Sequence, residues 1–150
     1  MAGHSNPEKK LTARPIVEFM ERHGWHCESL EVGTTWGGAP IGTPGRADYL
    51  FIRSLDPNGV AALIFCEFKA PNAVMRCNCR PAAYEQNAKG RMVQRKRAHK
   101  CRMCAQAEFR DLMRRKGFVC VQFAHVEAYK KWFLENFGWT MQSSLDLQSA

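Results

Sequence analysis

An aspartate and a Glu-x-Lys pair stand at the ends of two strand-like segments and have the residue types of a metal site that hydrolyses phosphodiesters. Asp48 opens the first segment, and Glu67 and Lys69 close the second. Phosphodiester hydrolysis requires a cation that neutralises charge on the phosphoryl oxygens, carboxylates that hold the cation, and a group that positions the attacking water. We therefore expect Asp48 and Glu67 to bind a metal and Lys69 to serve the water and the phosphate.

The two segments that carry these residues are predicted to form a β-hairpin. Residues 47–52 have the composition of a strand, residues 56–59 (DPNG) are typical of a turn, and residues 61–68 form a second, nearly continuous apolar strand. Antiparallel pairing through this turn brings Asp48 and Glu67 to the same end of the sheet.

The two-residue period of a strand relates Glu67 and Lys69 to each other. It places both side chains on one face and sends Phe68 the other way, into the core. The backbone carbonyl of Phe68 is then an additional oxygen ligand for a hard cation such as Mg²⁺, or for Mn²⁺. A Glu-x-Lys pair by itself is more often a solvated ion pair, and only its combination with Asp48 favours a catalytic role.

The other apolar periods complete a mixed α/β pattern. Gly24 and Gly117 suit the ends of the first two helices, and the glycine- and proline-rich residues 33–45 are predicted to be a loop. The order of elements predicts a mixed central sheet flanked by helices on both faces. Helices are predicted over residues 15–23, 103–116 and 126–137, and further strands over residues 25–32 and 118–123.

The bulk composition is that of one globular domain with a basic surface. With 150 residues, of which 45% are hydrophobic, the chain can bury a core as a single domain over residues 1–150. The formal charge of +8 favours a polyanionic partner such as nucleic acid, with an anionic membrane surface as the other candidate. No apolar run could span a bilayer and no secretion signal is evident, so we expect an intracellular, cytoplasmic protein that binds DNA and no membrane.

Four cysteines have the spacing of a structural zinc site. Cys77 and Cys79 form a C-x-C pair, and Cys101 and Cys104 form a C-x-x-C pair after twenty-one further residues. In a reducing compartment such pairs bind metal more often than they form disulfides, and a tetrahedral zinc would keep a basic segment with little apolar content ordered. The alternatives are four free thiols, or His99 as a substitute ligand. The other cysteines are predicted to be small core residues: Cys27, Cys66 and Cys120.

An insertion over about residues 71–102 separates the second strand of the hairpin from the next helix. Its basic run over residues 91–102 is predicted to contact DNA phosphates without reading sequence, and a merely solvated basic face is the alternative. In the loop before the hairpin, Trp36 could either stack on an unpaired base or cap the core. The predicted DNA-binding residues are Arg91, Arg95, Lys96, Arg97 and Lys100.

Three segments resemble a known nuclease family. GTPGRADYLFI, LIFCEFKAP and QAEFRDLMRRKGFVCVQF are similar to the VRR-NUC family of the PD-(D/E)xK nuclease superfamily, over roughly residues 14–137 with one large interruption. The resemblance implies a restriction-endonuclease-like fold and an active centre of Asp48, Glu67, Lys69 and Gln106. It also implies that Glu18 supports the metal from the first helix.

Two departures from the family pattern stand out. Arg46 and Ala47 precede Asp48 where the family usually has a proline, and about thirty residues separate the Glu-x-Lys pair from the helix of Gln106. Without the resemblance, Gln106 would be a plain helix-start residue and Glu18 a solvated side chain. Small members of the family resemble homodimeric nucleases of branched DNA, including Holliday junctions, so a homodimer is a hypothesis for this chain.

The combined expectation is an Mg²⁺-dependent endonuclease that hydrolyses DNA phosphodiester bonds and selects branched structures. If the chain is encoded by a phage, it would act in the host cytoplasm. A non-catalytic, zinc-stabilised nucleic-acid-binding module is the alternative from another class. A sequence-specific restriction-type endonuclease is the alternative within the same class, and RNA is a second candidate substrate.

Overall fold

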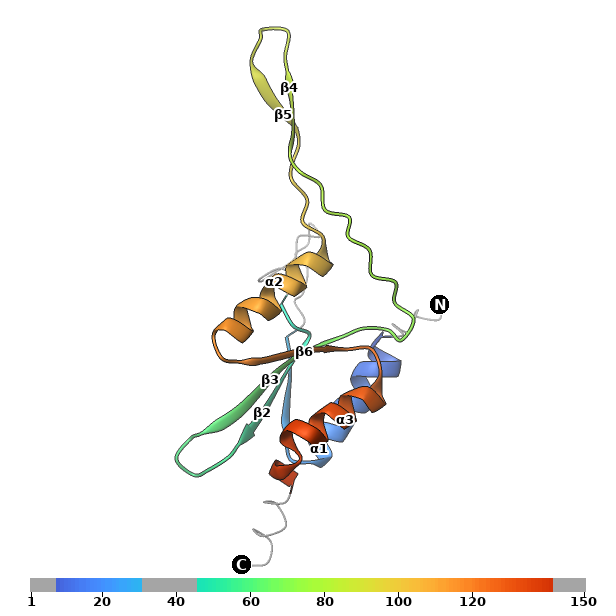
Figure 1. Ribbon diagram of the computed structural model, residues 1–150, viewed down its shortest axis with the longest axis vertical. Helices are drawn as coiled ribbons and strands as arrows, with labels where there is room; N and C mark the ends of the chain where they lie inside the picture. The colour runs from blue at the N-terminus through green and yellow to red at the C-terminus, as the bar shows by residue number, and fades with distance from the viewer. Residues whose placement is uncertain (1–7, 31–45, 142–150) are drawn as a thin grey trace, which may run out of the picture.

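The computed structural model describes residues 8–30 and 46–141, which form a mixed α/β fold (Figure 1). The predicted strand over residues 61–68 and the predicted helix over residues 126–137 are confirmed at both ends. The predicted loop with Trp36, and the last two residues of the predicted strand over residues 25–32, lie outside the described residues. The elements in chain order are η1 (Lys9–Ala13), α1 (Arg14–Arg22), β1 (His26–Ser29), β2 (Tyr49–Ser54), β3 (Ala61–Phe68), β4 (Ala83–Gln86), β5 (Met92–Lys96), α2 (Arg102–Arg115), β6 (Val119–Phe123) and α3 (Val126–Phe137).

The larger sheet has the strand order β1-β2-β3-β6 and is mixed, as predicted. β2 pairs antiparallel with β1 and with β3, whereas β6 runs parallel to β3. The turn between β2 and β3 is held by Asp56, whose Oδ1 accepts hydrogen bonds from the backbone N–H groups of Asn58 and Val60 at 2.8 and 3.1 Å. An aspartate that bonds the backbone two residues on is a local turn signal, which is why the sequence predicted this hairpin.

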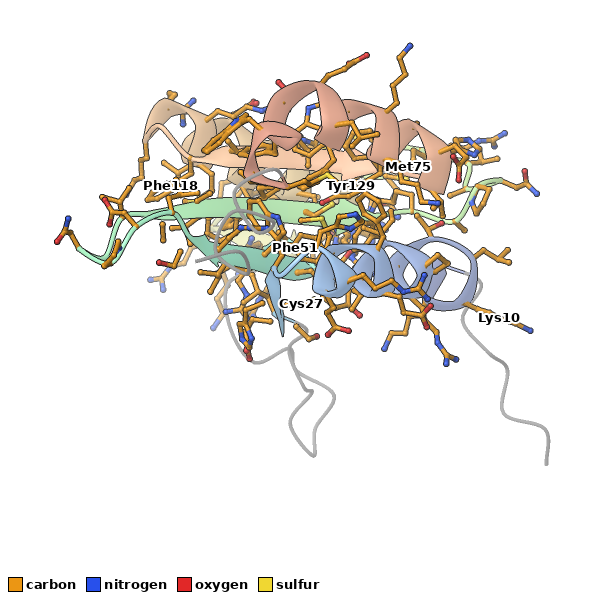
Figure 2. The ribbon with its side chains drawn as sticks, turned by 90° about the horizontal axis from the view of Figure 1, so that it is seen from below. Lys10, Cys27, Phe51, Met75, Phe118 and Tyr129 are labelled. Carbon is orange, nitrogen blue, oxygen red and sulfur yellow. The ribbon has the colours of Figure 1, made fainter. Side chains whose placement is uncertain are left out.

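One face of the sheet carries the main hydrophobic core and is covered by α1 and α3 (Figure 1). Phe51 and Phe68 point into this core and are fully buried, together with Tyr129 of α3. The rings of Phe51 and Tyr129 lie 6.2 Å apart inside the molecule, whereas Lys10 points away from it (Figure 2). Each such apolar side chain contributes about 1.5–3 kcal/mol on burial, so this layer is the main source of stability.

The opposite face of the sheet is covered by α2. Phe65, which alternates with the core residues along β3, packs against Phe109 of α2 with ring centroids 5.8 Å apart. Glu67 lies on the same face as Phe65, because residues two apart in a strand share a face. The expected helices on both faces are therefore present, and the face under α2 is the one that carries the Glu-x-Lys pair.

The first helical segment begins earlier than predicted. A π-helical segment, Lys9–Ala13, runs directly into α1, and Pro15 lies in the first turn of α1. Thr12 is fully buried, and its single hydroxyl proton is shared between the carbonyl oxygens of Lys69 at 2.9 Å and Ala124 at 3.2 Å. The partners of this polar residue lie at the ends of β3 and β6, far away in the chain, so the local sequence pattern does not reveal that Thr12 is buried.

The two glycines predicted to end helices do so. Gly24 and Gly117 have φ values of +78° and +84°, a left-handed conformation that other residues adopt only at a cost. After Gly24 the chain enters β1, and after Gly117 it enters β6. At these turns the chain leaves α1 and α2 and reverses into the strands β1 and β6.

The predicted insertion contains two strands that the sequence reasoning missed. β4 and β5 form an antiparallel hairpin, continued by a bridge between Arg80 and His99, which projects from the rest of the molecule (Figure 1). The turn signal was present, because Asn87 Oδ1 accepts from the backbone N–H groups of Lys89 and Arg91 at 3.0 Å each. Almost every side chain of the two strands is exposed, so no apolar period marked them.

The helices of the described segments are short. The longest of them, α2, has 14 residues, whereas crossing a bilayer takes about 20 apolar residues. Among the described residues, no helix is both long and apolar enough to cross a membrane.

Candidate functional site

Asp48 immediately precedes β2, rather than opening the strand as expected, and lies opposite Glu67. Tyr49 pairs with Cys66 in the antiparallel ladder, so Asp48, one residue earlier, lies opposite Glu67, one residue later. The Asp48 side chain is 7% exposed, and its Oδ2 accepts a hydrogen bond from the backbone N–H of Phe68 at 2.9 Å. The predicted meeting of the two carboxylates at one end of the sheet is therefore present.

Glu67 and Lys69 share a face and contact each other, as the two-residue period predicted. The Lys69 ammonium donates to Glu67 Oε1, and the backbone N–H of Lys69 donates to the carbonyl oxygen of Phe123 at 2.9 Å, which extends the pairing with β6. Both side chains are buried, and Phe68 between them lies in the hydrophobic core. The predicted role of the Phe68 backbone carbonyl as an additional metal ligand stays a prediction.

Gln106 is brought into the same cluster by α2. Its side chain is 2% exposed and bridges the Glu-x-Lys pair: the amide oxygen accepts from Lys69 Nζ at 2.8 Å, and the amide nitrogen donates to Glu67 Oε1. The amide can do this because it carries both a donor and an acceptor. The structure thus joins Gln106 to Glu67 and Lys69 across 37 or more residues of chain.

Burial makes ionised Glu67 unfavourable. Loss of solvent and the nearby Asp48 raise the pKa of Glu67 from 4.5 to about 7, although Lys69 and Arg102 oppose the shift. Among the described residues, the second carboxylate oxygen, Oε2, is buried without a hydrogen-bond partner. A buried carboxylate oxygen without a donor, close to a second carboxylate, is costly unless the group is protonated or binds a cation.

Two residues of the cluster were not predicted from the sequence. Arg102 is the first residue of α2, and its guanidinium lies 3.4 Å from Asp48 Oδ1 and 4.0 Å from Glu67 Oε1. Its position at the end of the basic run was visible, but its proximity to the carboxylates was not. Thr12 was also missed, although its hydroxyl donates to the Lys69 carbonyl and so fixes the backbone of the lysine.

Glu18 is not brought to this cluster. It lies on the exposed surface of α1, where its carboxylate accepts a hydrogen bond from Arg14 one turn earlier at 3.1 Å. An exposed pair of this kind contributes about 0.3–0.5 kcal/mol. The predicted role of Glu18 at the metal therefore gains no support from the structure.

The cysteines predicted to bind zinc gather at one point. The Sγ atoms of Cys77, Cys79, Cys101 and Cys104 all lie within 4.8 Å of one another, so the group could hold a metal ion such as zinc. His99 is not part of this group, and its backbone pairs with Arg80 in the hairpin.

The cluster environment changes the pKa values of two thiols. The backbone N–H groups of Cys104 and Asn78 lower the pKa of Cys101 to about 6, whereas hydrogen bonds with the neighbouring thiols raise the pKa of Cys104 to about 12. The cluster thus favours one thiolate and disfavours further ones, as expected for thiols crowded together without a positive ion.

The remaining cysteines are largely as predicted. Cys66 and Cys120 are buried in the sheet, and burial raises the pKa of both thiols. Cys27 is only half-buried, because β1 is an edge strand.

The basic residues predicted to bind DNA are exposed, and most belong to the projecting hairpin. Arg91, Lys96 and Arg97 are solvent-exposed. Arg95 pairs with Glu85 across the hairpin at 3.0 Å, and a further predicted residue, Lys100, pairs with Glu108 of α2 at 2.6 Å. Exposed pairs are weak and can be exchanged for phosphate contacts.

Comparisons with protein-family models, with curated proteins and with solved structures give no match to this chain. The features that bear on its function are the buried cluster, the four cysteines and the basic hairpin.

Proposed function

We propose that this protein is a metal-dependent nuclease that hydrolyses DNA phosphodiester bonds at the cluster of Asp48, Glu67, Lys69 and Gln106. The observation that carries the proposal is the burial of two carboxylates and a lysine at one end of the sheet, where Oε2 of Glu67 has no hydrogen-bond partner within residues 8–30 and 46–141. An ordinary core would not keep these charges out of water, because their desolvation is costly. Perturbed, buried ionisable groups of this kind are typical of functional sites.

The donor set fits Mg²⁺ or Mn²⁺, held by the carboxylates of Asp48 and Glu67. Such a cation, when bound, would neutralise charge on the phosphoryl oxygens. Lys69 orients the attacking water and stabilises the negative charge that develops on the phosphate, because its ammonium lies beside Glu67. Gln106 is a positioning residue, since it holds Lys69 and Glu67 relative to each other.

The choice of DNA as substrate rests on charge and on the sequence resemblance. The chain carries a formal charge of +8, and the projecting hairpin presents exposed arginine and lysine side chains on strands that have no core of their own. Such a surface supplies affinity for phosphates without sequence specificity. The resemblance to VRR-NUC nucleases, with a restriction-endonuclease-like fold, further favours branched DNA and a homodimer.

Cleavage assays test the proposal directly. Labelled four-way junction, flap, single-stranded and linear duplex DNA of shared sequence would be incubated with Mg²⁺ or Mn²⁺ and with the wild type or Lys69→Ala. Loss of an Arg or Lys at a transition-state contact lowers the rate about 10²-fold or more, which is the expected effect of Lys69→Ala. Lys131→Ala removes an exposed lysine of α3 and should cleave like the wild type.

A non-catalytic, zinc-stabilised nucleic-acid-binding module is the second candidate, favoured by the cysteine cluster and the basic hairpin. In both cases the four cysteines would hold a structural Zn²⁺. Binding of DNA without cleavage in Mg²⁺ and Mn²⁺ would select this candidate over the nuclease. Equal cleavage of a linear duplex and a junction, restricted to one sequence, would instead indicate a restriction-type endonuclease.

A further inference from the structure

The four clustered cysteines come from the two chain segments that enter and leave the projecting hairpin. Cys77 and Cys79 follow β3 and precede β4, whereas Cys101 and Cys104 stand at the beginning of α2. A metal bound by all four cysteines would therefore connect the segment that follows β3 and Lys69 with the start of α2.

The sulfur positions match a tetrahedral metal site. Sulfur atoms lie 3.6 Å apart for Cys77 and Cys104, 3.5 Å for Cys79 and Cys101, and 3.9 Å for Cys77 and Cys101. Zinc at about 2.3 Å from four tetrahedral sulfurs places them about 3.8 Å from one another. A disulfide would require about 2.05 Å, so the distances fit a shared cation rather than two disulfide bonds.

The backbone around the cysteines is arranged to receive thiolates. The N–H of Cys101 donates to the sulfur of Cys79 at 3.2 Å, and the N–H of Cys104 donates to the sulfur of Cys101 at 3.5 Å. Cys101 is the N-cap of α2, where the helix dipole also favours negative charge. These interactions stabilise sulfur in its metal-binding, deprotonated form.

The start of α2 buries little apolar surface. Along its 14 residues only Ala105 and Gln106 are buried, and Leu112 is 40% exposed. Yet this first turn and a half carries Arg102, beside Asp48, and Gln106, between Glu67 and Lys69. Because the Phe109 contact with Phe65 lies further along the helix, the first turns of α2 gain little from apolar packing, and metal binding would add to their anchoring.

We propose that a zinc ion bound by Cys77, Cys79, Cys101 and Cys104 fixes the start of α2 on the sheet and so holds Gln106 in the buried cluster. Zinc binding can supply free energy for this anchoring, because the thiols are dispersed in the unfolded chain and converge only in the folded one. The basic hairpin between the two cysteine pairs is anchored at its base by the same ion. Only the significance of Gln106 for cleavage rests on the proposed nuclease function; the zinc site and its effect on α2 do not.

Metal content and spectroscopy test the site. The 150-residue chain purified with zinc in the medium should contain about one zinc per chain, as four thiolates form one tetrahedral site. Replacement by Co²⁺ should give the charge-transfer absorption of cobalt bound to thiolates. Cys77→Ser should lose both signals, whereas Cys27→Ser, which alters a half-buried cysteine outside the cluster, should keep them. A wild type without zinc, or a Cys77→Ser variant that keeps it, would overturn the proposal.

Amide hydrogen exchange tests the effect on α2. Zinc loss should speed exchange in the first half of α2 and in the hairpin by about ten-fold or more, while amides of β3 and α3 stay protected. The measurement is made on Cys77→Ser and also on wild type after chelation and after zinc is restored, so that a variant that unfolds does not decide the result. Unchanged exchange in α2 on zinc removal would refute the proposal that zinc fixes the start of α2. This outcome is independent of whether the protein cleaves DNA.

Discussion

Replacing Glu67 by glutamine should stabilise the folded protein at pH 8 when no divalent cation occupies the carboxylate cluster. Burial and Asp48 raise the pKa of Glu67 from 4.5 to about 7 in spite of Lys69. One pKa unit corresponds to about 1.4 kcal/mol, so keeping the carboxylate ionised in the folded state costs about 3 kcal/mol at pH 8. Glutamine has nearly the shape of the protonated carboxyl group and removes this cost.

The gain should depend on pH in one direction. Because the pKa of Glu67 is higher in the folded state, that state binds the proton more tightly than the unfolded chain does. The stabilising contribution of this group is fully present below pH 4.5 and is lost as the pH rises through about 7. The difference between Glu67→Gln and the wild type should therefore be small near pH 4 and reach about 3 kcal/mol near pH 8.

Urea unfolding monitored by tryptophan fluorescence, in buffer free of Mg²⁺ and with both proteins treated alike with zinc, would measure the difference between variant and wild type at pH 4 and at pH 8. The matched control is Glu18→Gln on the exposed surface of α1, which should change the unfolding free energy by no more than about 0.5 kcal/mol. Mg²⁺ should stabilise the wild type and not Glu67→Gln, since only the former keeps both carboxylates. A variant no more stable than the wild type at pH 8, or a difference that does not shrink toward pH 4, would refute the reasoning.

Further changes probe the backbone anchor, the core and the hairpin. Thr12→Val keeps the side-chain volume but removes the hydroxyl donor from the buried Lys69 carbonyl and the partly buried Ala124 carbonyl, and should lower the unfolding free energy by about 1–3 kcal/mol in the same urea assay. Phe68→Ala, which empties a fully buried site, should cost about 3–5 kcal/mol and reduce the yield of folded protein. Combined alanine substitution of Arg91, Lys96 and Arg97 should flatten the dependence of log K on log salt for DNA binding by up to about 0.9 per residue, with folding unchanged; an unaltered slope would place the phosphate contacts elsewhere.

Much of the fold follows from local signals. The apolar run of β3 and the aromatic period of α3 predicted both elements at their observed bounds, and Gly24 and Gly117 end helices as their conformational freedom requires. The hairpin of β4 and β5 escaped prediction because it is exposed on both faces and so has no apolar alternation, although Asn87 marked its turn. Bounds are predictable where burial imposes an apolar run or an apolar period on the segment.

The sequence by itself determined that Glu67 and Lys69 share a strand face and that Asp48 meets them at one end of the hairpin, because strand period and turn chemistry are properties of neighbouring residues. Only the tertiary structure decided that Arg102 lies beside Asp48, and that four sulfurs converge where α2 begins. The raised pKa of Glu67 also belongs to the tertiary structure. Distances between segments far apart in the chain, and the water excluded where they pack, are set by the whole fold and not by local sequence.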